Sequence, residues 1–177
     1  MNIRNSTFSN CIEENGIFKF DDEKSYCGVF NIRNTEFLYN ESVKGGVVYV
    51  GLTDRSRCKI SFYDSTFRNN IAKMYGGVIF SIDDSVKEKV LFDHCEFFNN
   101  TSDFGNIAYS LNMNSEPNFI FDDPSTLQEL KSMSNSFVTN PTKLVFSTDS
   151  HQINEVYSGE LINEEIIGKK KIFLVNI

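Results

Sequence analysis

Three adjacent acidic pairs are the side chains of this sequence best suited to hydrolytic chemistry. They are Asp21-Asp22, Asp83-Asp84 and Asp122-Asp123. Two carboxylates that flank a sugar bond can divide the roles of general acid and nucleophile, as in glycoside hydrolases. The first two pairs, however, stand beside lysines in short polar segments, and aspartate favours turns because its side chain bonds nearby backbone amides. We therefore interpret these pairs as solvated turns and predict no catalytic residue.

The histidines and cysteines give no pattern typical of a metal site or an activated nucleophile. His94 follows Asp93 in a predicted strand, and His151 lies in a polar segment. No CxxC spacing occurs among the cysteines, which are Cys11, Cys27, Cys58 and Cys95. This spacing argues against zinc and leaves the disulfide state open. We interpret the cysteines as small buried hydrophobes and predict neither a metal nor another cofactor.

The overall charge excludes two classes of partner. The 177 residues carry 17 Lys and Arg against 24 Asp and Glu, a net charge of −7. Nucleic acid and anionic membrane surfaces both attract basic faces, so neither is an expected partner. No apolar run reaches the roughly 20 residues of a membrane span. The N-terminus lacks signal-peptide features, as expected of a mature, truncated or cytosolic chain.

A repeat of about 30 residues organises the first two thirds of the chain. The copies are STFSNCIEENGIFKF from residue 6, TEFLYNESVKGGVVYV from residue 35, STFRNNIAKMYGGVIF from residue 65 and CEFFNNTSDFGNIAYS from residue 95. A shared phenylalanine anchors them at Phe8, Phe37, Phe67 and Phe97, with separations of 29, 30 and 30 residues. Three residues later stand Cys11, Asn40, Asn70 and Asn100. Such a unit is too small to bury its own apolar face, but stacked copies can do so.

The columns of the repeat predict an all-β fold, a right-handed parallel β-helix. Apolar residues seven and five positions before each phenylalanine alternate with polar ones, as in strands with one buried face. Stacking at the ~4.8 Å spacing of neighbouring strands then makes the phenylalanines an internal stack and the asparagines an internal ladder. The recurring glycines, Gly16, Gly45, Gly76 and Gly105, allow a tight turn with positive φ.

The repeats are predicted to occupy residues 1–147, becoming less regular after residue 118. A short helix is expected at 125–131 with Ser125 as its cap, because serine accepts a bond from the first turn. Residues 148–177 form a separate β segment, which either caps the repeats or begins a β-sandwich. Alternation at 171–175 predicts a strand there.

Two motifs of the repeat resemble those of known repetitive proteins. FxxN occurs at Phe37-Asn40, Phe67-Asn70 and Phe97-Asn100, and a double glycine occurs at Gly45-Gly46 and Gly76-Gly77. This pairing is similar to the repeat of chlamydial polymorphic outer-membrane proteins, which are surface adhesins. The wider pattern resembles large extracellular repeat proteins of anaerobic gut fungi, including cellulosome scaffoldins. The resemblance implies an extracellular or cell-surface β-helix whose partners are protein modules, such as dockerin-bearing enzymes, or polysaccharide.

We expect a non-catalytic scaffold or interaction module, scaffoldin-like in its docking of partner enzymes. The alternatives are an adhesin that binds glycans or a host surface, and a fragment of a carbohydrate-active enzyme; the fold alone cannot choose among them. Aromatics outside the core columns are the candidate contacts because interfaces favour them. They are Tyr39, Tyr63, Tyr75, Phe104 and Tyr109. Sequons at Asn5 and Asn99 are the plausible glycosylation sites, since those at Asn40 and Asn100 fall on the ladder.

Overall fold

The computed structural model describes residues 1–21, 28–52, 58–139, 143–147, 153–157 and 172–174. The chain divides into two compact units, Met1–Val138 and Thr139–Ile177. This division falls before the boundary at residue 147 that the repeat pattern predicts. The two units are described separately below.

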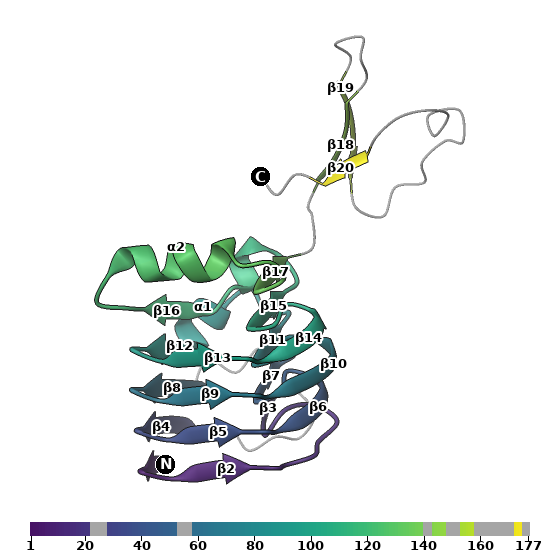
Figure 1. Cartoon of the computed structure of the whole chain (residues 1–177). Helices are drawn as coiled ribbons and strands as arrows, with labels where there is room; N and C mark the ends of the chain where they lie inside the picture. Colours follow the sequence, from purple (N-terminus) through teal and green to yellow (C-terminus); the bar gives the residue numbers. More distant parts are fainter. Residues whose placement is uncertain (22–27, 53–57, 140–142, 148–152, 158–171, 175–177) are drawn as a thin grey trace. The chain divides into compact units, whose positions relative to one another are not determined.

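The first unit is all-β, consisting mainly of parallel sheets with few helices (Figure 1). The first sheet contains β1 (Asn2–Arg4), β4 (Val29–Arg33), β8 (Lys59–Tyr63), β12 (Val90–Asp93) and β16 (Asn118–Ile120). The second contains β2 (Thr7–Ser9), β5 (Glu36–Leu38), β9 (Thr66–Arg68) and β13 (Glu96–Phe98). The third contains β6 (Glu41–Lys44), β10 (Ile71–Tyr75) and β14 (Thr101–Phe104). The fourth contains β3 (Phe18–Phe20), β7 (Val48–Val50), β11 (Ile79–Ser81), β15 (Ala108–Ser110) and β17 (Phe137–Thr139).

The second, third and fourth repeats pass through all four sheets in the same order, and equivalent residues pair in register. Phe37 lies opposite Phe8 on one side and Phe67 on the other. In the third sheet of the first repeat, two isolated bridges from Ile12 and Asn15 take the place of a strand. The strands of each sheet follow one another in a linear order, so each sheet is open and ends in two edge strands.

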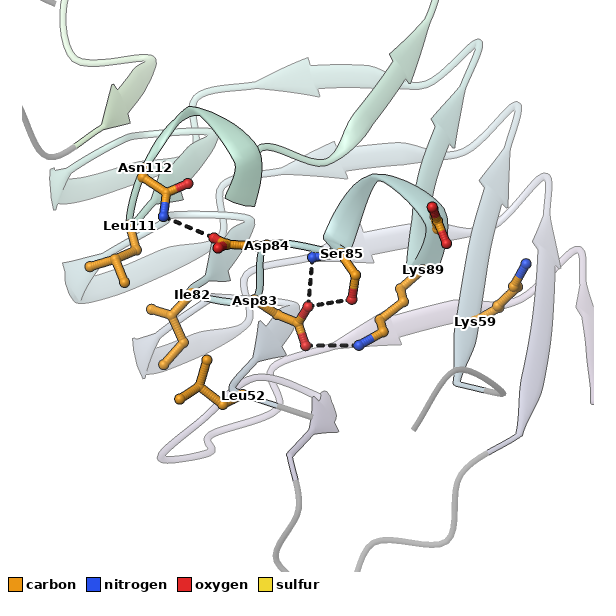
Figure 2. Close-up of a pocket in the computed structure, with 10 residues that line it drawn as sticks. Leu52, Lys59, Ile82, Asp83, Asp84, Ser85, Lys89, Leu111 and Asn112 are labelled. Carbon is orange, nitrogen blue, oxygen red and sulfur yellow. Dashed lines mark hydrogen bonds and ion pairs between the residues drawn. The ribbon is translucent and has the colours of Figure 1, made fainter. Parts of the chain in front are cut away.

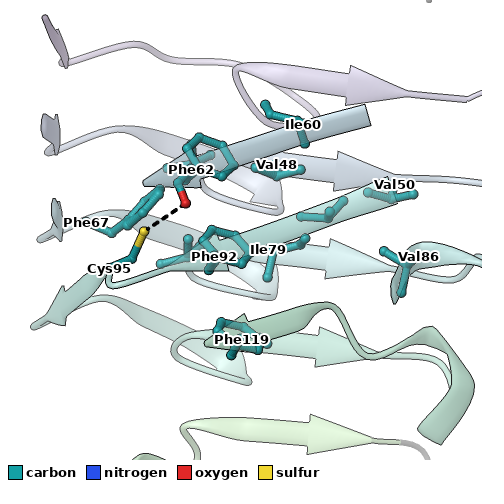
Figure 3. Packing of buried hydrophobic residues seen from close by; sticks show 14 of the residues in the cluster. Val48, Val50, Ile60, Phe62, Phe67, Ile79, Val86, Phe92, Cys95 and Phe119 are labelled. Atoms are coloured by element: carbon teal, nitrogen blue, oxygen red, sulfur yellow. Dashed lines mark hydrogen bonds between the residues drawn. The ribbon is translucent and has the colours of Figure 1, made fainter. Parts of the chain in front are cut away.

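Stacked phenylalanines form the centre of the core (Figure 3). Successive rings of the second sheet lie 5.2, 4.9 and 5.3 Å apart from Phe8 through Phe37 and Phe67 to Phe97. A second column in the first sheet spaces Phe62, Phe92 and Phe119 at 5.0 Å. The two columns meet edge to face, which suits the ring quadrupoles. Phe37 and Phe67 are fully buried, whereas Phe8 and Phe97 at the two ends are half-buried.

The asparagines form a hydrogen-bonded ladder at the corner between the second and third sheets. Asn70 Nδ2 donates to Asn100 Oδ1 and to the Phe37 carbonyl, both at 2.9 Å. Asn70 Oδ1 accepts from Asn40 Nδ2 at 2.8 Å and from the Asn40 backbone amide at 3.1 Å. The fully buried amide of Asn70 is thus satisfied by the repeats on both sides of it.

Two short helices interrupt the repeats where none was predicted. They are α1 (Val86–Lys89) and the 3₁₀ helix η1 (Met113–Ser115). Both are too short to leave a helical period in the sequence. The predicted helix at 125–131 is present as α2 (Pro124–Ser132). Its cap is Asp123 rather than Ser125, because the Asp123 carboxylate accepts from the Ser125 amide at 2.8 Å.

The second unit contains a three-stranded antiparallel sheet. Its strands are β18 (Lys143–Ser147), β19 (Ile153–Tyr157) and β20 (Ile172–Leu174), in the order β19-β18-β20. The predicted strand at 171–175 corresponds to β20. That this segment caps the repeats or begins a β-sandwich stays a prediction.

Removing one ladder amide should destabilise the first unit strongly. In Asn70→Ala, the Phe37 carbonyl and the Asn40 amide lose buried partners, which should lower the free energy of unfolding by about 3 kcal/mol. Urea unfolding measures the change. Lys73→Ala, which removes an exposed ion pair with Glu41, is the control and should cost at most about 0.5 kcal/mol. Equal stability losses in the two variants would contradict a structural role for the ladder.

The turn glycines provide a second test. Gly76 has a φ of +66°, and an added Cβ would lie 2.1 Å from the Ile79 carbonyl oxygen. Gly76→Ala should therefore cost at least about 2 kcal/mol of unfolding free energy. Gly28→Ala is the matched control, since the nearest atom to its added Cβ is 3.9 Å away. Thermal unfolding of both variants should show a lowered midpoint only for Gly76→Ala.

Candidate functional site

An outward-facing column of aromatic side chains runs up the fourth sheet. Along β11, Ile79 and Ser81 point into the core and are fully buried, so Phe80 between them points outward. The register places Tyr49 of β7 and Tyr109 of β15 on either side of Phe80. The rings stack at 5.2 Å for Tyr49 and Phe80 and at 5.5 Å for Phe80 and Tyr109.

A second outward column ends the third sheet, directly before the glycine turn. Tyr75 of β10 pairs in register with Phe104 of β14 and with Lys44 of β6. Gly45, Gly76 and Gly105, which follow them, have φ values of 64°, 66° and 78°, as the sequence predicts. This turn brings the end of the third sheet close to the middle of the fourth.

The two columns meet and form one outer aromatic cluster of Tyr49, Tyr75, Phe80, Phe104 and Tyr109. The Tyr75 ring centroid lies 4.6 Å from that of Tyr109, 5.6 Å from that of Phe104 and 6.0 Å from that of Phe80. Tyr75, Phe104 and Tyr109 are three of the five candidate contacts from the sequence. The fold therefore gathers these three into a single surface.

Stacking leaves the faces of most of these rings covered. The Phe80 and Tyr109 rings are nearly parallel, at 6°, and the two residues are only 6% and 7% exposed. Phe104, by contrast, is 51% exposed. Below the cluster, the Lys44 and Lys19 ammonium groups lie 5.5 and 6.0 Å from the centroids of Phe80 and Tyr49. Cations at this distance are attracted to the ring faces.

The other two candidate contacts lie elsewhere. Tyr39 follows β5 with a φ of 55° and is 58% exposed. Tyr63 ends β8, and the Arg33 guanidinium covers its ring at 3.8 Å. In the part of the chain that the structure describes, no ring contact joins either tyrosine to the outer aromatic cluster.

Phe80 and Tyr49 belong to the cluster but were not among the candidates. Both sit in runs of apolar residues after the double glycine, where outward and inward positions look alike in composition. An alignment of the middle residue of each strand of the fourth sheet, from β3 to β15, could have identified them. Lys19, Tyr49, Phe80 and Tyr109 share one register column.

A hollow of about 590 Å³ lies beside α1, where acidic residues predicted to be solvated turns are placed (Figure 2). Asp83 is in fact 5% exposed, so the prediction of a solvated turn is wrong for this residue. Its carboxylate pairs with Lys89 Nζ at 2.8 Å and accepts from the Ser85 amide at 2.8 Å. Asp84 accepts from Asn112 Nδ2 at 2.9 Å. Asp83 thus holds the loop to α1, and Asp84 holds it to the cap of η1.

His94 and Cys95 are adjacent, but they do not form a nucleophile and base. His94 lies in the turn after β12 with a φ of 52°, not in a strand as predicted. Its Nδ1 contacts Asp93 at 2.5 Å and its Nε2 contacts Asp122 at 2.8 Å. Cys95 is 3% exposed, and burial raises the pKa of its thiol to about 12. Such a thiol is not ionised at neutral pH.

The remaining predictions concern metal ligands, cysteines, sequons and membrane-spanning helices. Within the described ranges, no three His, Cys, Asp or Glu side chains converge as a metal site would require. Cys58 is disulfide-bonded, Cys11 and Cys95 are free, and Cys27 lies outside the described residues, as does His151. Asn5 and Asn99 are exposed, whereas Asn40 and Asn100 are buried in the ladder. No helix in the described part of the chain is long and apolar enough to cross a membrane.

Comparison of the chain with protein-family models, curated proteins and solved structures finds no match.

The His94 bridge should make stability depend on pH. Hydrogen bonds that His94 donates to the Asp122 carboxylate, and then to that of Asp93, raise the pKa of His94 above its ordinary 6.5. The bridge therefore contributes fully below pH 6.5 and is lost as pH rises through the higher pKa of the folded state. His94→Asn removes the imidazole but keeps a residue suited to positive φ, as Asn5 and Asn34 do at the equivalent turns.

Thermal midpoints from pH 6 to 9 measure this effect. The wild-type protein should lose more stability across this range than His94→Asn does. His151 is common to both proteins and cancels in the comparison. Parallel pH profiles would show that the bridge does not contribute to stability.

Proposed function

We propose that this chain is a non-catalytic extracellular interaction module whose outer aromatic cluster docks partner proteins. In this proposal the first unit is a segment of a right-handed parallel β-helix, similar to the repeats of fungal scaffoldins and chlamydial surface proteins. The observation that carries the proposal is the gathering of five aromatic rings from three repeats into one cluster outside the core, with Phe104 half exposed.

The strand order supports a parallel β-helix. The second, third and fourth repeats each contribute one strand to all four sheets, and the equivalent strands of neighbouring repeats lie parallel and in register. Inward Phe and Asn columns continue from repeat to repeat, as expected of a solenoid that buries its core by stacking.

The chemistry of the polar residues supports a non-catalytic role. Asp83 is held in a buried ion pair with Lys89, His94 is bracketed by two carboxylates, and Cys95 is a buried thiol. A general base or nucleophile must reach its substrate with a suitable pKa. None of these three side chains meets that requirement.

The geometry of the rings favours a protein partner over a glycan. Sugars stack on exposed aromatic faces, but most faces here cover one another, with interplanar angles of 17° for Tyr49 with Phe80 and 6° for Phe80 with Tyr109. Phe104, half exposed beside Tyr75, offers a rigid anchor of the kind that concentrates binding energy at protein interfaces. Small protein modules, such as those that attach enzymes to scaffoldins, are the partners that the resemblance implies.

The disulfide at Cys58 supports an extracellular location. Disulfides persist in oxidising compartments and are rare in the cytosol. The exposed sequons at Asn5 and Asn99 are compatible with secretion.

Capture of partners on the purified protein tests the proposal. Secreted proteins from the source organism are passed over the immobilised wild type, Phe104→Ala, Tyr75→Ala and Tyr39→Ala. Enzymes that share one small module should bind the wild type, and Phe104→Ala should weaken this binding by about tenfold or more, as expected for an aromatic anchor. Tyr39→Ala removes a ring of similar exposure outside the cluster and should leave binding unchanged.

The same protein is tested in parallel on insoluble cellulose and pectin. Retention on polysaccharide without capture of any protein would contradict docking and favour the adhesin. Cleavage of the polysaccharide would instead favour a fragment of an enzyme.

A further inference from the structure

The fifth repeat is incomplete in a way that exposes two strand edges. It adds β16 to the first sheet and β17 to the fourth. Between them the chain forms α2 instead of strands for the second and third sheets. As a result, β13 ends the second sheet and β14 ends the third.

The edge of β14 is closed by Asn135. Asn135 Nδ2 donates to the Ser102 carbonyl, and Asn135 Oδ1 accepts from the Gly105 amide, both at 3.0 Å. A single side chain thus replaces part of the missing strand. This arrangement satisfies backbone groups that an open edge would leave free.

Among the residues that the structure describes, the edge of β13 has no such partner. In the repeat below, the Ser65 carbonyl accepts from the Glu96 amide and the Asn69 amide donates to the Phe98 carbonyl, both at 3.0 Å. By this register, the Cys95 carbonyl and the Asn99 amide, together with the backbone of Phe97, face away from β9. No strand in the described part of the chain pairs on that side of β13.

A groove of about 450 Å³ lies beside this edge, between β13 and α2. Phe97 and Phe98 line it from the strand, and Phe121 and Leu130 line it from the α2 side. Phe98 is 42% exposed. The groove therefore combines an unpaired backbone with apolar walls.

The rim of the groove is acidic. Glu96, Asp122 and Asp123 line it, and the Asp122 side chain is 94% exposed. No lysine or arginine is among its lining residues. Among the lining residues the basic group is His94, which is bridged to Asp93 and Asp122, and the Arg68 guanidinium of the repeat below lies 5.2 Å from the centroid of the Phe98 ring.

We propose that this groove binds an extended basic peptide of a partner protein, which adds a strand to the edge of β13. The peptide backbone pairs with Phe97 and Asn99, an apolar side chain enters between Phe98 and Leu130, and lysine or arginine faces the acidic rim. Strand addition of this kind takes affinity from main-chain bonds and specificity from alternate side chains. A second copy of this chain is disfavoured as the occupant, because two acidic rims would face each other.

The test uses an acetylated and amidated hexapeptide of alternating lysine and valine. Amide exchange is followed by NMR in the complete protein. Saturating peptide should slow exchange at Phe97 and Asn99 by about tenfold or more, because pairing protects these amides. The same peptide with every backbone amide N-methylated has no donor for the strand edge and should protect these amides far less.

Matched variants test whether binding depends on the groove or on equivalent residues of the repeats below it. Glu96→Lys should weaken binding by about fivefold, the scale of one exposed charge pair. Glu36→Lys changes the equivalent residue two repeats lower and should not weaken it. Phe98→Ser should likewise weaken binding, whereas Leu38→Ser, in the same register column, should not.

Two results would overturn the proposal. One is unchanged exchange at Phe97 and Asn99 at peptide concentrations that saturate binding. The other is protection of Thr7 and Ser9 alone, which would place the peptide on β2, the opposite edge of the same sheet. Neither result bears on the outer aromatic cluster, since Tyr75 and Phe104 take no part in the groove.

Discussion

The arrangement of the first unit depends on one interaction, the hydrogen bonding of buried asparagine amides between neighbouring repeats. Asn40, Asn70 and Asn100 each donate to the backbone of the repeat before them, to Phe8, Phe37 and Phe67 respectively. A buried amide without a partner is costly, so each asparagine fixes the height and register of two repeats at once. The phenylalanine columns follow this register, because a shift of one residue would turn every inward ring to the outside.

The outward-facing side chains follow the same register as the inward ones. Because equivalent residues stand directly above one another, a ring placed outward in one repeat meets the ring of the next. Tyr49, Phe80 and Tyr109 become a stack in this way, and Tyr75 joins it across the glycine turn. The repeat that buries the core thus also collects side chains that are far apart in the sequence. A binding surface then requires only that some outward positions carry aromatics.

Much of this architecture could be predicted from the sequence, because the same environment recurs in each repeat. Phe67 and Asn70 stand in columns whose physical meaning is clear from their spacing alone. The Asp83–Lys89 pair could not be predicted in this way, since the recurring Phe, Asn and Gly columns do not extend to this segment. The cap of α2 was also misplaced, because Asp123 and Ser125 are both good caps and only the course of the chain decides between them.

The sequence predicted only part of the candidate site, for a similar reason. Exposure of Tyr75 and Phe104 follows from their place before the turn glycines. The outward direction of Phe80 depends on which alternate positions of a wholly apolar strand face the core, and composition does not reveal this. Tyr39 and Tyr63 have the same residue type but lie on other corners, and a residue type does not specify its neighbours.

The second glycine of each turn has a consequence for how such a protein can change in length. An added Cβ at Gly46 would lie 2.1 Å from the Gly77 carbonyl oxygen, and one at Gly77 would lie 2.2 Å from that of Asn106. At these positions the backbone of the following repeat leaves no room for a side chain. Asn106 occupies the equivalent place in the fourth repeat and does carry a side chain. Its Oδ1 accepts a hydrogen bond from Asn135 Nδ2, which belongs to the incomplete fifth repeat. A duplicated unit with glycine at this position can therefore accept another full repeat directly above it, whereas the unit that contains Asn106 is followed by the incomplete fifth repeat.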